Sequence, residues 1–142
     1  MSKNKLAAII VICTMAIIAA IVVPRLINGP DTNSDFENTP VNAISCYEAK
    51  DHIGERTTVH GVVVDTNYAS GSSGQPTFLN MCYAYPSPNR FTVVIWGENR
   101  GKFSQPPEDY YDGKTIYVSG LIVSYQGVPE IEVTSPSQIL EE

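Results

Sequence analysis

The feature that most constrains this chain is a long apolar segment near its N-terminus, followed by a polar remainder. Leu6–Val23 comprises eighteen residues, of which Thr14 alone is polar. As a helix that rises about 1.5 Å per residue, the segment would span roughly 27 Å, close to the thickness of the hydrocarbon core of a bilayer. The sequence therefore predicts a helix long enough to cross a membrane.

A cleaved signal peptide is the rival interpretation of this segment. Signal peptides have a shorter apolar region, of roughly 7 to 15 residues, and small residues at the cleavage site. Here the segment ends in Ile21–Arg25 (IVVPR), which is bulky where a peptidase requires small side chains. We therefore expect an uncleaved anchor. Lys3 and Lys5 precede it, so the positive-inside rule makes residues 1–27 a cytoplasmic stub and a single transmembrane helix in the cell membrane.

The rest of the chain is then expected outside the cytoplasm, as a linker and one domain. Residues 28–42 (NGPDTNSDFENTPVN) are rich in Asn, Asp, Pro, Gly and Thr, which predicts a flexible linker. Residues 43–142 are enough for one small domain with a single core. All fifteen acidic residues follow Arg25, with only six basic ones, so the chain after Arg25, linker and domain together, carries a net charge of −9. Such a balance argues against tight, sequence-independent binding of nucleic acid.

The cysteines and histidines suggest little chemistry. Cys46 and Cys82 lie in the external part, where a disulfide is permitted, but two free buried thiols remain the alternative. We expect no metal site, because there is no CxxC motif and His52 and His60 have no second ligand at zinc spacing. No Ser-His-Asp signature, phosphate loop or paired acid and base is found, so we expect neither a cofactor nor enzymatic activity.

Alternating apolar residues predict an all-β domain. The expected strands are Arg56–Tyr68, Thr77–Met81, Arg90–Trp96, Thr115–Tyr125 and Val128–Thr134. The first is long and expected to bend at Gly61, and Gln126-Gly127 predicts a tight turn before the last. Five strands with an irregular connection between the third and fourth predict a small closed Greek-key barrel.

Shorter features accompany these strands. Ser45 and Glu48 can cap a short helix that Gly54 ends, and a helical turn is expected over Asn99–Phe103. The pattern G-x4-V-x-G occurs twice, at residues 54–61 and 113–120. We interpret this echo as a geometric need shared by two strands rather than as a repeat array.

A resemblance to a known family supports this layout. The stretch from Ile44 to Leu140 includes VHGVVVDTNYASGSSGQPTFLN, FTVVIWGENRGKF, YDGKTIYVSGLI and GVPEIEVTSPSQI. It resembles the OB-fold domains of prokaryotic proteins catalogued as DNA-binding or as appendages of thermonuclease-like proteins. The resemblance covers about two thirds of the chain. It implies a five-stranded OB barrel, although OB folds bind oligonucleotides, sugars, proteins and haem.

The resemblance also implies a binding surface on the second and third strands and the adjoining loops. Carried onto this sequence, the surface comprises Tyr68, Phe78, Asn80, Arg90, Thr92, Trp96 and Tyr125, with Lys102 as a further cation. Aromatic side chains beside a cation are suited to stacking on bases. The alternative for each aromatic residue is packing in the core or at the barrel edge, which is common for aromatic side chains.

Two related activities fit less well. Nothing in the chain matches the catalytic motifs of the staphylococcal nuclease barrel. The haem chaperone of cytochrome c maturation has the same architecture, but its C-terminal HxxxY histidine has no counterpart, because no histidine follows His60. We therefore expect a membrane-anchored binding module for single-stranded nucleic acid. The alternative, which the charge of −9 favours, is an interaction or structural domain that docks a protein of the cell envelope.

Overall fold

The computed structural model describes residue 40 and residues 42–142. The predicted transmembrane segment and nearly all of the predicted linker lie outside these residues. In the part that is described, no helix is long and apolar enough to cross a membrane. Thr39–Glu142 forms a compact unit of its own.

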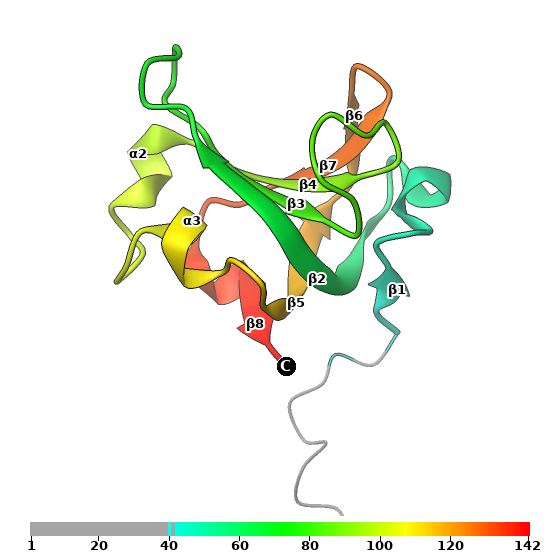
Figure 1. The fold of residues 1–142 in the computed structure, drawn as a ribbon. Helices are drawn as coiled ribbons and strands as arrows, with labels where there is room; N and C mark the ends of the chain where they lie inside the picture. Colours follow the sequence, from blue (N-terminus) through cyan, green and yellow to red (C-terminus); the bar gives the residue numbers. More distant parts are fainter. Residues whose placement is uncertain (1–39, 41) are drawn as a thin grey trace, which may run out of the picture. The chain divides into compact units, whose positions relative to one another are not determined.

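The regular structure of the unit is mostly strand, as predicted (Figure 1). The strands are β1 (Ile44–Ser45), β2 (Arg56–Tyr68), β3 (Thr77–Met81), β4 (Phe91–Ile95), β5 (Thr115–Leu121), β6 (Val123–Tyr125), β7 (Val128–Glu132) and β8 (Ile139–Glu141). The helical turns are η2 (Ala49–His52), α2 (Gly97–Arg100), α3 (Pro107–Tyr110) and η3 (Pro136–Gln138). The prediction of a β domain is confirmed to this extent: the described unit is mostly β.

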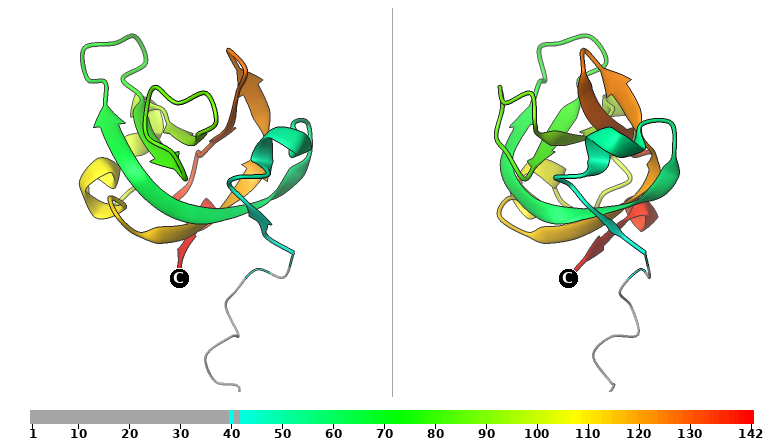
Figure 2. Two further views of the ribbon diagram at one scale, coloured as in Figure 1. Left: turned by 45° about the vertical axis from the view of Figure 1, so that its right-hand side comes forward. Right: turned by 90° about the vertical axis from the view of Figure 1, so that its right-hand side faces the viewer.

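One eight-stranded sheet runs in the order β6-β7-β4-β3-β2-β5-β8, and β1 pairs in parallel with β2. The pairing of β4 with β7 is also parallel, and the remaining pairs are antiparallel. Figure 2 shows that β2 is strongly curved; β5 pairs with its N-terminal half, β3 pairs with its C-terminal half, and β4 pairs with β3. The sheet thus wraps around a single core.

The prediction of five strands in a closed barrel is wrong in two respects. The hydrogen-bonded order among the described strands is open, with β6 and β8 at its ends. The predicted strand Thr115–Tyr125 is divided at Ile122, whose backbone bonds to Gly54 and Glu55 while its side chain is fully buried. The other additional strands, β1 and β8, are too short for an alternating pattern to reveal them.

The alternation of apolar residues places the core inside the curved sheet. Its largest fully buried side chains come from β2, β3, β4, β5, β7 and the segments beside them: Val59, Val63, Leu79, Met81, Phe91, Val93, Ile95, Ile116, Val118, Ile122, Ile131 and Val133. On β2 the outward-facing Val62 and Val64 are exposed. β4 is buried on both faces, which removes the alternation of exposure that marks a surface strand.

The repeated glycine pattern reflects the same geometry in two paired strands. Gly54 and Gly113 both have positive φ, of 92° and 76°, a conformation that glycine adopts without strain. Gly61 and Gly120 leave room for neighbours, since a Cβ at Gly120 would lie 2.5 Å from Ile131. The interpretation of the echo as a shared geometric need therefore agrees with the structure.

A disulfide joins Cys46 to Cys82, with Cα atoms 6.1 Å apart. Cys46 lies directly over Gly61, where an added Cβ would be 2.0 Å from the sulfur. The bridge ties the segment before η2 to the end of β3, from which the loop 82–90 departs. The absence of a side chain at Gly61 is what permits this close approach.

Gly61→Ala is therefore expected to destabilise the domain by about 1–3 kcal/mol, the usual range for an overpacked site. Thermal unfolding should show a midpoint lower by about 4–8 °C for each kcal/mol lost. Gly71→Ala is the matched control, because a Cβ there meets nothing within 4 Å. Equal midpoints for the two variants would contradict this account of Gly61.

Candidate binding groove

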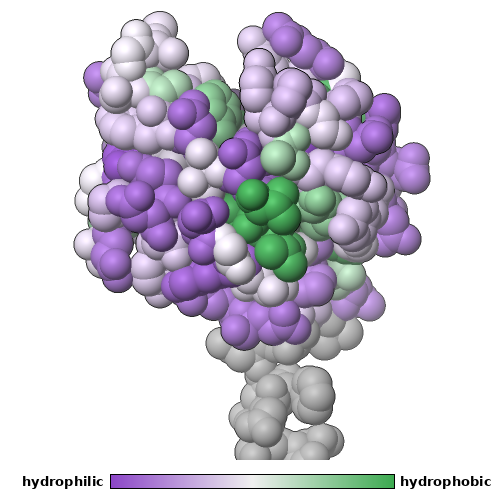
Figure 3. Space-filling model, in the orientation of Figure 1, coloured by the Kyte–Doolittle hydropathy of each residue, from purple (hydrophilic) through white to green (hydrophobic). Residues whose placement is uncertain are grey.

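A groove with a volume of about 840 Å³ lies on the outer face of β2, β3 and β4, between the β6–β7 hairpin and the loop 82–90. Figure 3 shows a notch beside the lobe that includes the β6–β7 hairpin; the loop 69–76, on the other side of this notch, contributes no lining residue to the groove. The groove is lined by Asp65, Thr66, Asn67, Phe78, Asn80, Tyr85, Pro86, Pro88, Arg90, Thr92, Tyr125, Gln126, Val128 and Glu130. It is both polar and aromatic.

Its floor is a line of hydrogen-bonded polar side chains across three strands. Thr92 Oγ1 donates to Asn80 Oδ1 at 2.9 Å, and Asn80 Nδ2 donates to Asp65 Oδ2 at 2.8 Å. The same Asp65 oxygen accepts from the backbone N–H of Tyr85 at 3.1 Å, which ties the loop to the floor. Asn80 and Thr92 are buried, so these bonds satisfy groups that would otherwise lose water unpaired. The floor is therefore rigidly organised.

Its rim is aromatic. Tyr85 is 70% exposed and Tyr125 is 62% exposed, while Phe78, which lines the groove from β3, is half-buried. Tyr125 ends β6, next to the predicted turn at Gln126-Gly127. Both turn residues have positive φ, of 51° and 81°, as a type I′ hairpin requires. The turn thereby holds an exposed ring at one wall of the groove.

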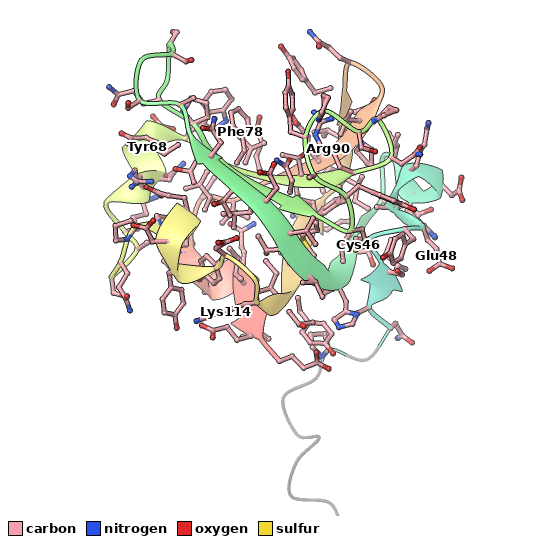
Figure 4. The ribbon with its side chains drawn as sticks, viewed as in Figure 1. Cys46, Glu48, Tyr68, Phe78, Arg90 and Lys114 are labelled. Carbon is pink, nitrogen blue, oxygen red and sulfur yellow. A yellow bond between two sulfur atoms is a disulfide. The ribbon has the colours of Figure 1, made fainter. Side chains whose placement is uncertain are left out.

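Arg90 is the one basic residue among the described residues that line the groove. Its Nη1 donates to the carbonyl oxygen of Ser87 at 2.7 Å, and its Cζ lies 5.2 Å from the centre of the Tyr85 ring. Its Nε is buried without a hydrogen-bond partner in the described part of the chain. The guanidinium is thus held against the loop 82–90, facing the groove (Figure 4).

Glu130 brings a half-buried carboxylate to the same face. It lies opposite Thr92 in the parallel pairing of β4 and β7. Burial raises the pKa of Glu130 above 4.5, and the nearby Glu132 raises it further, while Arg90 lowers it. With Asp65, two carboxylates and one guanidinium line the groove, so its charge is not suited to holding a series of phosphates.

Four of the residues predicted for ligand binding are brought together here: Phe78, Asn80, Arg90 and Tyr125, with Thr92 beneath them. Tyr68, Trp96 and Lys102 do not line the groove. The Arg100 guanidinium covers the Tyr68 ring at 3.8 Å. The Trp96 ring packs on Gly74, where a Cβ would lie 2.9 Å from it.

Lys102 and the neighbouring cation are also committed to internal contacts. Lys102 Nζ donates to Asn99 Oδ1 at 2.7 Å and to the carbonyl oxygen of Thr134 at 2.9 Å. Arg100 donates to both carboxylate oxygens of Glu108 and, at 2.7 Å, to Thr77 Oγ1. These cations tie α2 to the segments around it.

Sequence reasoning did not assign Asp65, Tyr85 or Glu130 to this surface. Tyr85 belongs to a loop whose path the sequence does not reveal. Glu130 joins the site through the parallel pairing of β7 with β4, which connects segments far apart in the sequence. The only available signal was the alternation that turns Glu130 outward while Ile131 is buried. In the described residues, no three His, Cys, Asp or Glu side chains lie close enough to hold a metal ion.

Comparison with known proteins adds little. No protein-family model and no curated protein matches the chain. Solved structures that match include a chain assigned as an aspartyl-tRNA synthetase from Leishmania major Friedlin (12% identity, TM-score 0.48) and the aspartyl-tRNA synthetase of Entamoeba histolytica (13%, 0.47). The matches cover 80% and 74% of this chain and 23% of each synthetase chain. This chain therefore spans about a quarter of their length.

A third match is a chain assigned as a nucleic acid-binding lipoprotein from Klebsiella pneumoniae. Its identity is 15% and its TM-score 0.44, over 73% of this chain and 99% of that one. With identities this low and TM-scores below one half, none of the three likenesses says what this chain binds.

Proposed function

We propose that this chain is an OB-fold binding module, held outside the cytoplasm by a single N-terminal membrane helix, that binds single-stranded nucleic acid weakly in the groove. The apolar length of Leu6–Val23 supports the anchor. The Cys46–Cys82 disulfide fits an oxidising compartment outside the cytoplasm. As a binding module, the chain is proposed to have neither catalytic activity nor a cofactor.

The strand order supports the OB assignment. β2, β3 and β4 form an antiparallel meander, β7 lies parallel beside β4, and β5 lies on the other side of β2. If β5 and β6 are counted as one bent strand, five principal strands remain. β5 and β7 contact each other without a ladder, as expected of a partly open OB barrel.

The observation that carries the proposal is the pair of exposed tyrosines that line a groove with a polar floor. Tyr85 and Tyr125 offer ring faces on which bases can stack, and base stacking tolerates any sequence. The groove lies on the strands and beside the loops through which OB folds bind oligonucleotides. Because Arg90 is the one cation lining it, in the part of the chain that is described, binding depends on stacking more than on charge.

This balance gives a salt dependence unlike that of a basic nucleic-acid binder. Affinity for a single strand falls with a logarithmic slope of about −0.7 per neutralised phosphate. With one arginine, affinity should fall only about threefold between 50 and 200 mM salt. A much steeper loss would place the contact on a different, basic surface.

We expect Tyr125→Ala to weaken binding of a single-stranded oligonucleotide by about 5- to 150-fold, the equivalent of roughly 1–3 kcal/mol for one stacked base. Fluorescence anisotropy with the unit Thr39–Glu142 measures this, and gel analysis of the recovered oligonucleotide checks for cleavage. Tyr47→Ala is the matched control, because Tyr47 is 65% exposed but lies outside the groove. Equal losses in both variants would contradict a groove-specific contact.

Docking of an envelope protein is the second candidate function. The domain is acidic, and Val62, Val64 and Tyr83 are each more than 40% exposed on or beside β2. Figure 3 shows an apolar patch on the face that β2 presents in this view. If single strands do not bind at all, while the folded unit captures a defined envelope protein, docking is the better account.

A further inference from the structure

The groove holds an unused set of polar atoms that a nucleobase edge could satisfy. Asp65, Asn80 and Thr92 already bond to one another along the floor. Glu130, in contrast, makes no hydrogen bond or ion pair with any described residue, although it is half-buried. A half-buried carboxylate without a partner favours any ligand that brings N–H donors to it.

Arg90 precedes Thr92 by two residues, Thr92 lies opposite Glu130 in the pairing of β4 with β7, and all three residues line the groove. Arg90 is close enough to lower the pKa of Glu130, yet the two side chains form no ion pair. Of its guanidinium nitrogens, Nη1 donates to Ser87 and Nε is buried, so Nη2, which has no hydrogen bond within the described chain, is the donor left for a ligand. The groove therefore offers two acceptor oxygens from Glu130 and donor capacity from Arg90.

Among the four bases, guanine has the edge that complements this set. Its edge presents two adjacent donors, N2–H and N1–H, followed by the acceptor O6. A carboxylate accepts two parallel N–H groups at once, and an arginine donates to O6. Thymine, cytosine and adenine lack two adjacent donors. A carboxylate that would repel phosphate is thus useful if it faces a base edge, which reconciles the acidic groove with nucleic-acid binding.

We propose that Glu130 and Arg90 make the groove selective for guanine in single strands, with Glu130 accepting from N1–H and N2–H and Arg90 donating to O6. This inference rests on the proposed function. Tyr85 and Tyr125 supply sequence-tolerant stacking, and the Glu130–Arg90 pair supplies discrimination.

The test uses the unit Thr39–Glu142, which has its own core, and single strands of about ten bases, a length typical of one OB fold. One strand alternates guanine with thymine, one contains thymine only, and one replaces guanine by hypoxanthine, which lacks the N2 amino group. The guanine strand should bind at least about fivefold more tightly than the thymine strand. The hypoxanthine strand should lose most of this gain.

Glu130→Gln keeps the shape of the side chain but replaces one acceptor by a donor, so the preference should fall to within about twofold. Glu132→Gln removes the same charge from the same strand outside the groove and should keep the preference. Equal binding of guanine and thymine strands by the unmodified protein would overturn this inference and leave the proposed function intact. Failure of every strand to bind would overturn both. If Glu130→Gln unfolds at the normal temperature and still prefers the guanine strand over the thymine strand, Glu130 does not determine the preference, and the inference is wrong.

Discussion

Replacing both bridge cysteines, in a Cys46→Ser/Cys82→Ser variant, is expected to lower the free energy of unfolding of the Thr39–Glu142 unit by about 4 kcal/mol. The disulfide closes a loop with a sequence separation of 36 residues, and removing such a link restores conformational entropy to the unfolded chain. Urea unfolding measures the loss directly.

The serine at position 46 would also be buried, because Cys46 is 2% exposed. Reduction of the unmodified protein separates the two effects, since it opens the bridge without adding a hydroxyl. A reductant should destabilise the unmodified protein by a similar amount and leave the double variant unchanged. A loss below about 1 kcal/mol on reduction would show that the bridge contributes little to stability.

Arg100→Met should be the next most damaging change, at about 3 kcal/mol. Arg100 pairs with both oxygens of Glu108, bonds Thr77 and covers the Tyr68 ring, so its removal leaves a carboxylate without a partner. Breaking a buried ion pair costs about 3–5 kcal/mol, and the lower end applies because both side chains remain about a fifth exposed. Arg56→Met, at an exposed arginine, is the control and should change stability by less than about 0.5 kcal/mol.

The Arg100 variant also has a defined pH dependence. The hydrogen bond from Arg100 lowers the pKa of Glu108 below 4.5. A carboxyl group whose pKa is lowered by folding stabilises the folded state at pH values above its pKa in the unfolded chain. This contribution is lost as the pH falls through its pKa in the folded protein. The stability gap between the unmodified protein and Arg100→Met should therefore be largest above pH 4.5 and narrow below it. A gap that is constant between pH 7 and pH 3 would contradict the ion-pair account.

Local patterns predicted the principal strands because each carries an alternating apolar face that must be buried. The curvature of β2 was also expected, although its register shift lies between Val63 and Asp65 rather than at Gly61. The turn at Gln126-Gly127 was predictable too, because positive φ has a local signature. The division of a strand at Ile122 was not, because it depends on backbone bonds to Gly54 and Glu55 across the sheet. The short edge strand β8 depends likewise on pairing with β5.

The site was predictable where it follows single strands. Phe78 and Asn80 alternate outward on β3, so one pattern places both on the same face. The same strand pattern places Trp96 and Tyr68 at this surface, yet Trp96 packs on Gly74 of the loop 69–76 and Arg100 covers Tyr68. Such contacts connect residues far apart in the sequence. Glu130 lines the groove because β7 pairs in parallel with β4, and no local sequence pattern encodes this pairing.

The most direct test of the groove as a binding site is an NMR titration of isotope-labelled Thr39–Glu142 with a short guanine-containing single strand. The account predicts that the largest amide shifts cluster at Phe78, Asn80, Tyr85, Arg90 and Tyr125, with saturable binding. Shifts that cluster instead around Tyr47, Val62 and Val64, or no shifts at saturating oligonucleotide, would contradict it.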